Sequence, residues 1–387
     1  MSNVNKLIKK NNFYGFRLIF VAIVSLITLI MFAFVYISAS YFLGVDNIIF
    51  LAVMLGLSFS FIISNSLVND YPSSISNKIY HLSCIINGTV FYLFLANIFL
   101  WVLNIFNSYF PFNLNLYNIS LLAYIFVVIL NIYGLYNANN IKIKKVIIQI
   151  KNLPDIWLDK TAAFISDTHY GAIYNKSSAT KLVKIINKIN PDFLFHTGDF
   201  FDGPEMDWNS AAGEYKNINI KTKKYFVSGN HDEYAEKSIG NAEPVLSAIK
   251  NAGFTIIDGK LIAEDGVQII GVEYARSESV EKIKDNFNRN KYDNNKPSII
   301  LKHVPLSTDV ISELGADLML CGHTHNGQIF PFNFLTKKIY KGYNFRLKYN
   351  KNLAVYTTSG IGSWGPPQRI GTVSELVVIS FVKKYII

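Results

Sequence analysis

The stretch from Leu18 to Asn137 contains only three formally charged residues, Asp46, Asp70 and Lys78. Soluble domains carry a charge at roughly one position in four, so this stretch is typical of a membrane region. Helices buried in a large soluble core are the alternative, but they fit poorly with so little charge over such a length. After this stretch the charge is mixed, and glycine and proline recur regularly. The sequence therefore predicts a membrane anchor followed by a separately folded domain.

Four apolar runs within this region are long enough to cross a bilayer. Each is close to the ~20 residues that a helix needs to span the hydrocarbon core, and short polar loops separate them. The first run is too long for the core of a signal peptide, and three more follow it, so we expect it to be retained. The expected spans are Leu18–Phe42, Ile48–Leu67, Leu82–Phe106 and Ile119–Tyr136.

Positive residues next to these spans predict their orientation. All of them fall on one side of the membrane if both termini are cytoplasmic, which is the usual arrangement for loop lysine and arginine. We therefore expect an integral protein of the inner (cytoplasmic) membrane whose termini and catalytic domain are cytoplasmic. The flanking residues are Lys6, Lys9, Lys10, Arg17, Lys78, Lys142, Lys144 and Lys145.

The net charge of +10 raises the possibility of a nucleic-acid partner. No compact stripe of lysine and arginine interleaved with aromatic residues is present, so we expect no nucleic acid to bind. Cys84 and Cys321 are the two cysteines, and they make no plausible disulfide framework. This is typical of a reducing compartment.

The rest of the chain reads as short apolar strands, several of which end in polar side chains. Polar groups at the carboxyl ends of neighbouring strands gather at one edge of a sheet, where layered α/β proteins place their active sites. An Asp at a strand end often only caps the next helix. Five such clusters, which hold five of the seven histidines, are hard to explain by capping. The expected strands are 146–150, 162–166, 193–195, 224–227, 254–257, 267–272, 298–301, 318–320, 354–357 and 376–381, with helices at 178–189 and 244–251.

The clusters have a recurring composition of aspartate, asparagine and histidine. His-x-His alone is a weak signal for a metal site, because two surface or core histidines would look the same. Its spacing suits two adjacent ions better than one tetrahedral zinc. The clusters are Asp167-Thr168-His169, Gly198-Asp199-Phe200-Phe201-Asp202, Gly229-Asn230-His231-Asp232, His303, and Gly322-His323-Thr324-His325.

In this order the five clusters resemble the calcineurin-like metallophosphoesterase family, and most closely its bacterial membrane-associated branch. Asn326 stands where that branch usually has glycine, which leaves the ligands intact but affects the loop. The resemblance implies a four-layer α/β-β/α sandwich. With the membrane region, the expected organisation is an anchor of four transmembrane helices at 1–137, a linker and entry strand at 138–159, and the phosphoesterase domain at 160–387.

The resemblance also implies two divalent metal ions, which we expect to be Mn, Fe or Zn. Asp199 would bridge the two ions. His231 would be catalytic rather than a ligand, placed over the phosphate, and Asp202 and Asp232 would orient ligands. The implied ligands are Asp167, His169, Asp199 and His325 for one ion, and Asp199, Asn230, His303 and His323 for the other.

The expected function is therefore a membrane-anchored hydrolase in which a metal-bridging hydroxide attacks a phosphodiester or pyrophosphate bond. The alternatives are a phosphoesterase fold that has lost catalysis and acts as a scaffold, and a regulatory domain of a membrane sensor. A tether to the bilayer favours a phosphorylated, lipid-linked substrate. A segment at 330–345, in which six aromatic residues alternate with Lys337, Lys338 and Lys341, could lie on lipid headgroups, or it could be a hairpin packed on the sandwich.

Overall fold

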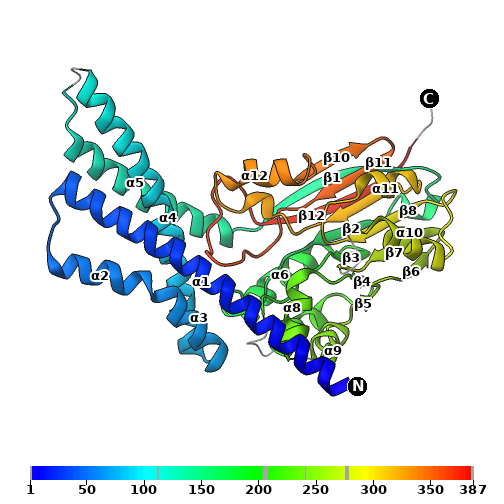
Figure 1. Cartoon of the computed structure of the whole chain (residues 1–387). Coiled ribbons are helices and arrows are strands. Elements are labelled where there is room, and N and C mark those ends of the chain that lie inside the picture. The colour runs from blue at the N-terminus through cyan, green and yellow to red at the C-terminus, as the bar shows by residue number, and fades with distance from the viewer. Residues whose placement is uncertain (1, 111–112, 204–207, 240, 275–278, 385–387) are drawn as a thin grey trace. The chain divides into compact units, whose positions relative to one another are not determined.

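The computed structural model describes residues 2–110, 113–203, 208–239, 241–274 and 279–384. The chain divides into two compact units, each of which is described by itself. The first consists of residues 1–136 with 365–368, and the second of residues 137–364 with 369–387. Figure 1 labels their helices and strands.

The first unit is built from long apolar helices. In the described residues four runs are long and apolar enough to cross a membrane, at Ile19–Leu43, Ile48–Asp70, Ser74–Tyr109 and Leu116–Asn139. The four expected spans are therefore confirmed as helical. The second run is divided at Phe59 into two helices. The helices are α1 (Ser2–Leu43), α2 (Ile48–Ser58), α3 (Ser60–Asp70), α4 (Ser74–Tyr109) and α5 (Leu116–Asn139).

Polar side chains join these helices to one another. Tyr124 of α5 donates to Asn97 of α4 at 2.8 Å, and the indole of Trp101 donates to Ser38 of α1 at 2.9 Å. Such bonds between spans add to packing in an apolar solvent, where water offers no competing partner. The asparagines of the anchor thus contribute to helix association.

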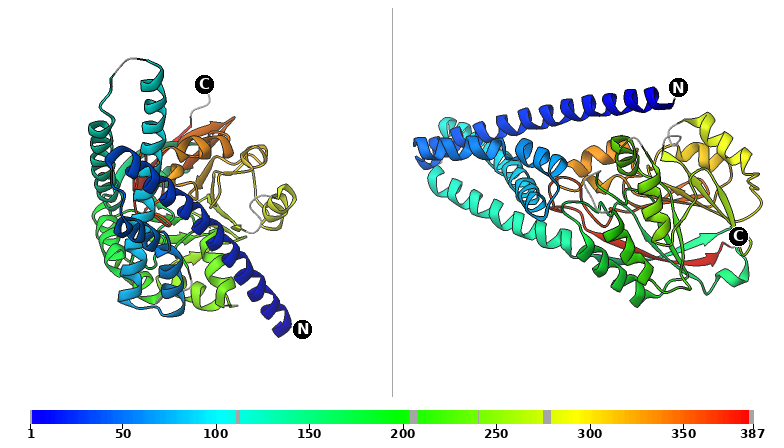
Figure 2. Two further views of the ribbon diagram at one scale, coloured as in Figure 1. Left: turned by 60° about the vertical axis from the view of Figure 1, so that its left-hand side comes forward. Right: turned by 90° about the horizontal axis from the view of Figure 1, so that it is seen from below.

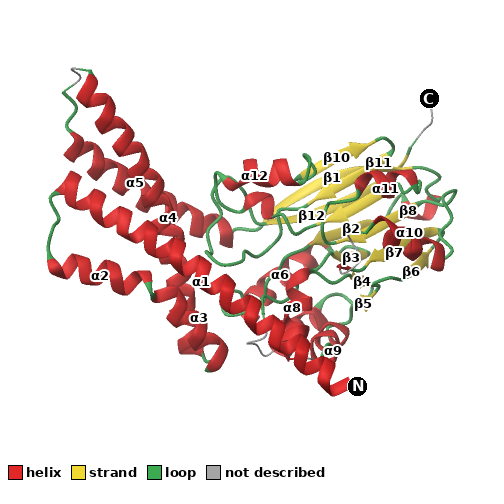
Figure 3. Cartoon of the chain, viewed as in Figure 1, coloured by secondary structure: helices red, strands yellow, loops and turns green. Residues whose placement is uncertain are grey.

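The second unit contains two six-stranded sheets, which Figure 3 shows in yellow. The first sheet has the order β1 (Lys142–Ile150), β12 (Glu375–Lys383), β2 (Thr161–Ile165), β3 (Phe193–His196), β4 (Lys223–Phe226) and β5 (Thr255–Ile256). The second has the order β10 (Arg346–Asn350), β11 (Leu353–Thr357), β9 (Leu318–Cys321), β8 (Ser298–Lys302), β7 (Val267–Val272) and β6 (Leu261–Glu264).

The main core lies between the two sheets. Phe164, Phe195 and Leu320 are among the fully buried side chains there, and the indole of Trp157 stacks on Phe193 with 4.7 Å between the ring centroids. These strands are apolar on both faces, as expected for strands covered on both sides.

Helices cover the outer faces of both sheets, which completes four layers and confirms the expected α/β-β/α architecture. The two views of Figure 2 show them from other directions. On the first sheet lie α6 (Lys176–Ile189), α7 (Trp208–Gly213) and α9 (Glu243–Asn251), and on the second α10 (Val280–Arg289) and α11 (Thr308–Glu313). The unit also contains α8 (Asn230–Ile239) and α12 (Phe332–Ile339).

The strand directions decide where the site forms. Strands β2 to β5 run parallel, and so do β7, β8, β9 and β11. Each set therefore brings its carboxyl ends to one edge of its sheet. Strand β12 pairs antiparallel with β2 and parallel with β1.

Some elements differ from those expected. β6 and β10 are antiparallel edge strands in which no residue is fully buried, so they lack the buried apolar run used to recognise strands. The aromatic segment at 330–345, for which a packed hairpin was one expectation, contains helix α12 and ends just before β10. Both cysteines are buried.

Candidate metal centre

The seven expected ligands come from both sheets and lie at the carboxyl ends of five strands. Asp167 and His169 follow β2, Asp199 follows β3, Asn230 follows β4, His303 follows β8, and His323 and His325 follow β9.

One group of ligand atoms comes from Asp167, His169 and His325. Their three atoms lie within 4.8 Å of one another, and all three side chains are buried. The Nε2 atoms of the two imidazoles are 3.1 Å apart, and His325 Nε2 is 3.6 Å from Asp167 Oδ1. This spacing allows a single cation to contact all three.

A second group comes from Asp199, His303 and His323, again within 4.8 Å. His303 Nε2 lies 3.2 Å from Asp199 Oδ2 and 3.2 Å from His323 Nδ1. The side-chain oxygen of Asn230 is also 3.2 Å from His303 Nε2. This group therefore offers nitrogen, carboxylate and amide ligands around one point.

Asp199 connects the two groups. Its Oδ2 atom, close to His303, is also 3.8 Å from Nε2 of His169 in the first group. His231 forms a third, overlapping group with Asp199 and His169, so its ring also lies close to both ligand groups. A carboxylate in this place can contact two cations at once.

The outer nitrogens of two of the rings identify which ring atom is free to bind a metal. His303 Nδ1 is 2.6 Å from the main-chain oxygen of Thr197, which can only accept, so Nδ1 carries the proton. His169 Nδ1 is likewise 3.1 Å from Oδ1 of Asp202. In the neutral form of each ring Nε2 therefore carries the lone pair, which is the usual arrangement for a metal-bound histidine.

His231 and Asp232 hold the surrounding loop together. Asp232 accepts four main-chain N–H groups, from Asp199, Phe200, Phe201 and Gly229, at 2.8–3.2 Å. The ring of His231 donates from Nδ1 to the main-chain oxygen of Asp202 at 2.8 Å, and its own N–H donates to Asp199 Oδ1 at 2.9 Å.

Five of the seven ligand positions have left-handed backbone. The φ angles of Asp167, His169, Asp199, His323 and His325 lie between 46° and 68°. Such a conformation costs a non-glycine residue about 1–3 kcal/mol and persists only where the surroundings enforce it. Strain gathered in this way is typical of a functional site.

Two motif glycines leave the space that the ligand carboxylates occupy. A Cβ on Gly229 would lie 2.1 Å from Asp199 Oδ1, and a Cβ on Gly322 would lie 2.3 Å from Asp167 Oδ2. Any larger residue at either position must displace a carboxylate. The glycines therefore belong to the site as much as the ligands do.

Burial and the Asp199 carboxylate shift the pKa values of the site residues in opposite directions. Burial lowers the pKa of His303, but the Asp199 carboxylate outweighs it and raises the pKa to about 9. Burial likewise raises the pKa of Asp199, but His303 and His231 hold it well below its ordinary range. Burial lowers the pKa of His323 to about 3. A divalent cation requires neutral imidazoles beside an ionised carboxylate, so His323 is already in the ligand state at neutral pH, whereas His303 must release a proton when a cation binds.

The donor set therefore fits a pair of divalent metal ions. Carboxylate and amide oxygens mixed with imidazole nitrogens suit Mn, Fe or Zn, and all come from buried or half-buried side chains.

Arg369 was not among the expected site residues. Its guanidinium is fully buried, donates to the main-chain oxygens of Ser359, Gly360 and Gly362, and approaches His325 Nδ1 at 3.2 Å. The sequence feature that could have indicated its role is an arginine a few positions after the glycine-rich segment at 359–362. The N–H of Gly362 donates to the main-chain oxygen of Asp167 at 2.7 Å, so Arg369 helps to fix the backbone of a candidate ligand.

Asn326, which replaces the expected glycine, also has left-handed backbone at φ 49°. Asparagine tolerates this region better than most residues. Its side-chain oxygen accepts a bond of 2.9 Å from Asn344. Asparagine is therefore compatible with this backbone conformation, and its side chain makes a contact of its own.

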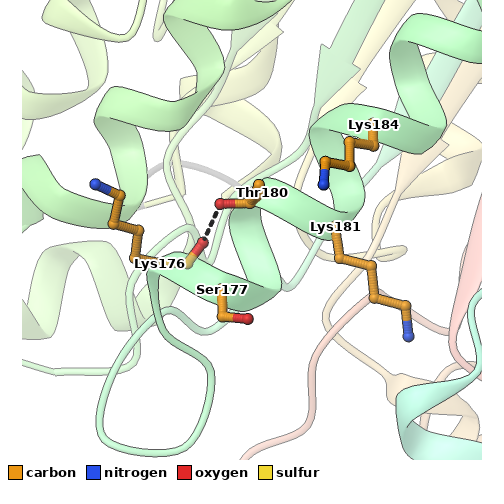
Figure 4. Close-up of a pocket in the computed structure, with 5 residues that line it drawn as sticks. All are labelled: Lys176, Ser177, Thr180, Lys181 and Lys184. Atoms are coloured by element: carbon orange, nitrogen blue, oxygen red, sulfur yellow. Dashed lines mark hydrogen bonds between the residues drawn. The ribbon is translucent and has the colours of Figure 1, made fainter.

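A separate open depression lies along α6 and encloses about 580 Å³. Figure 4 shows its lining residues, in which Lys176, Lys181 and Lys184 extend from the helix. None of its lining residues is a candidate ligand. The depression is therefore a basic surface feature and not the metal centre.

A family model described as calcineurin-like phosphoesterase matches residues 160–327. An uncharacterized metallophosphoesterase of Helicobacter pylori is 28% identical over 244 residues, which cover 61% of this chain and 64% of that protein. A Danio rerio transmembrane protein with metallophosphoesterase domain is 28% identical over 248 residues, which cover 62% of this chain and 56% of that protein. The chain thus spans less than two thirds of the length of either relative.

A solved dimetal phosphatase from Danio rerio covers 58% of this chain and 99% of its own, with a TM-score of 0.34 and 10% identity, which carries no conclusion about function. Similar proteins occur in animals as well as in bacteria. Residues 160–327 of this chain therefore match a calcineurin-like phosphoesterase domain, and four helices that are long and apolar enough to cross a membrane precede them in the sequence.

Proposed function

We propose that this protein is a membrane-anchored hydrolase that uses two divalent metal ions to cleave a phosphodiester or pyrophosphate bond. The observation that carries the proposal is the pair of ligand groups joined by Asp199. A site for two cations with one shared carboxylate suits phosphoryl transfer, in which negative charge spreads over several oxygens.

Within this proposal each ligand has a stated role. Asp167, His169 and His325 hold one ion, while Asn230, His303 and His323 hold the other. Asp199 contacts both. When bound, the two ions supply a hydroxide nucleophile at neutral pH and neutralise the charge of the phosphoryl group.

His231 is proposed as the acid that protonates the leaving oxygen. Its Nδ1–H donates to the main-chain oxygen of Asp202, so Nε2 is the ring atom that can deliver a proton. The side chain is partly exposed, which gives substrate access to it. Asp202 orients both His169 and His231, and Asp232 fixes the backbone around Asp199.

We further propose that the substrate is carried by a lipid and reaches the domain on the cytoplasmic side of the inner membrane. Support comes from the four apolar helices and from the lysines beside the expected spans. The proposed division of the chain is an anchor at 1–137, a linker and entry strand at 138–159, and a phosphoesterase domain at 160–387.

Metal analysis together with an assay on an aryl phosphodiester tests the proposal. Detergent-purified wild type should contain about two divalent ions per chain and hydrolyse the substrate. Asp199→Asn should lose metal and lower turnover at least 10²-fold, since one shared ligand serves both ions. Wild type with no metal, and no rate above that of the variant, would favour the inert scaffold instead.

A substrate screen then separates the classes of bond. Metal-loaded protein in detergent is presented with phosphomonoesters, phosphodiesters, pyrophosphates and lipid extracts, and phosphate release and lipid products are measured. We expect the highest kcat/KM for a lipid-borne diester or pyrophosphate. Equal turnover of soluble and vesicle-borne diesters by the intact protein would count against the lipid-linked substrate.

A further inference from the structure

Helix α12, which follows the His323–His325 loop, exposes the side chains that helices normally bury. Not one of its residues is buried. Phe334, Leu335 and Ile339 are 64%, 53% and 52% exposed. Phe330 and Phe332 at the start of the helix are also exposed.

The side of α12 that faces the domain is polar instead. Asn333 and Thr336 are half-buried, and Asn344 beneath them is buried. Asn344 donates to Asn326 at 2.9 Å and approaches the Thr336 hydroxyl at 3.5 Å, while that hydroxyl donates to the main-chain oxygen of Asn333 at 3.1 Å. The helix therefore has the reverse of the pattern expected where one face packs on a core and the other meets water.

The exposed face also carries positive charge. Lys337, Lys338 and Lys341 are exposed at the C-terminal end of the helix. Aromatic and aliphatic side chains bordered by lysines match the boundary between acyl chains and anionic headgroups. A protein partner would need no such cationic border. The chain also contains four helices that are long and apolar enough to cross a membrane, which would keep this surface near a bilayer.

The same surface is joined to the metal centre through the ligand loop. The ring of Tyr340 meets the ring of His323 edge-on, with 6.0 Å between centroids. The Thr324 hydroxyl donates to the main-chain oxygen of Asn344 at 2.6 Å. Because Tyr340 contacts His323 and Asn344 binds the neighbouring Thr324, any surface that α12 contacts is held at a fixed position relative to the ligand loop.

We propose that Phe330 and α12 form a docking surface that inserts its apolar face into an anionic leaflet and presents the metal centre to phosphate groups at headgroup level. The presentation of the metal centre to lipid phosphates rests on the proposed function. Insertion of α12 does not, because it needs no catalysis. Since the chain is already tethered, a modest affinity of the helix for lipid is enough to keep it inserted.

Collision accessibility of a spin label tests insertion without any measurement of turnover. Full-length Phe334→Cys is labelled with a nitroxide and placed in liposomes of phosphatidylglycerol and phosphatidylcholine. Ile220→Cys, at a position that is 98% exposed, is the matched control. Wild type treated with the same label measures any labelling of the two native cysteines, which are buried. We expect the label at 334 to collide several-fold more with oxygen than with a water-soluble nickel chelate, and the label at 220 to show the opposite. Equal chelate access at both positions overturns the proposal.

The lysine border predicts dependence on lipid charge. Lys337→Glu with Lys338→Glu should increase chelate access at position 334 in liposomes rich in phosphatidylglycerol. Lys216→Glu with Lys221→Glu changes the net charge equally at exposed positions outside the surface and should leave that access unchanged. Equal effects of both pairs would show that only total charge matters and would also overturn the docking surface.

Turnover separates this inference from the proposed function. Phe334→Ser with Leu335→Ser should lower the ratio of vesicle-borne to soluble diester hydrolysis several-fold. A wild type that inserts α12 but hydrolyses neither substrate contradicts the proposed function and leaves docking standing. A wild type that hydrolyses both, with 334 open to the chelate, contradicts docking alone.

Discussion

At the scale of single residues, the candidate site depends on glycines that have no side chain as much as on the ligand side chains. The space beside Asp167 exists because residue 322 has no side chain, and the same is true of Asp199 and Gly229. The left-handed backbone of the ligands adds a second constraint, because each deviation is tolerated only while its neighbours stay in place. Ligand geometry is therefore determined by residues that never contact a metal.

Substitution of Gly322 by alanine tests this dependence. The new Cβ would lie 2.0 Å from Ser166 Oγ and 2.3 Å from Asp167 Oδ2, so the carboxylate must move. We expect the affinity for Mn²⁺, measured by calorimetric titration, to fall about 10–100-fold. Gly213→Ala, where nothing lies within 4 Å of the added carbon, is the matched control and should bind as wild type does. Undiminished affinity in the Gly322 variant would show that the loop adjusts freely.

At the scale of elements, α8 places acidic side chains beside the end of β5. Burial raises the pKa of Glu236 to about 7, with Glu233 and Asp258 adding to the effect. Burial also raises the pKa of Asp258 to about 6. Both carboxyls hold a proton more tightly in the folded protein than in the unfolded chain, so they favour folding at low pH.

Stability should accordingly fall as these groups ionise. An unfolded glutamate titrates near pH 4.5, so the advantage of the protonated folded state is complete below that pH and is lost as pH rises through about 7. Glu236→Gln should stabilise the domain by about 1 kcal/mol at pH 8, after allowance for partial solvent screening, and have little effect at pH 5. Thermal unfolding in detergent measures this, with exposed Glu313→Gln as the control. Equal shifts at both pH values would contradict the sign.

How far the elements could be predicted depended on how closely each followed a simple pattern. Strands β2, β3, β8 and β9 are continuous apolar runs that end in ligands, so both their position and their chemistry were readable. Edge strands β6 and β10 were missed because they are short and contain no buried apolar run. Helix α12 was missed because its apolar face is turned outward, where a periodicity argument expects a core. Arg369 was missed because its role depends on carbonyl groups brought to it by folding.

At the scale of the whole molecule, the candidate ligands come from both sheets. Asp167, Asp199 and Asn230 follow strands of the first sheet, whereas His303 and His323 follow strands of the second. A cation shared among them cross-links both layers and offsets the repulsion between buried carboxylates. Metal binding should therefore stabilise the domain as well as activate it.

Thermal unfolding with and without metal checks this linkage. Free Mn²⁺ at a hundred times its Kd should stabilise the folded state by about 2.7 kcal/mol, because metal binds the folded site in preference to the unfolded chain. Chelation with EDTA should reverse the increase in Tm. Asp199→Asn should show a much smaller shift, and an equal shift in that variant would place the stabilising metal elsewhere.

The position of β12 between β1 and β2 has a consequence for how the protein is made. Lys142, just after the last apolar helix, pairs with Glu375, more than two hundred positions later in the chain. During translation β1 must wait beside the bilayer with an open edge until that distant partner emerges from the ribosome. Closure of the first sheet is therefore a late event in biogenesis, and until then the open edge of β1 can pair with neighbouring chains.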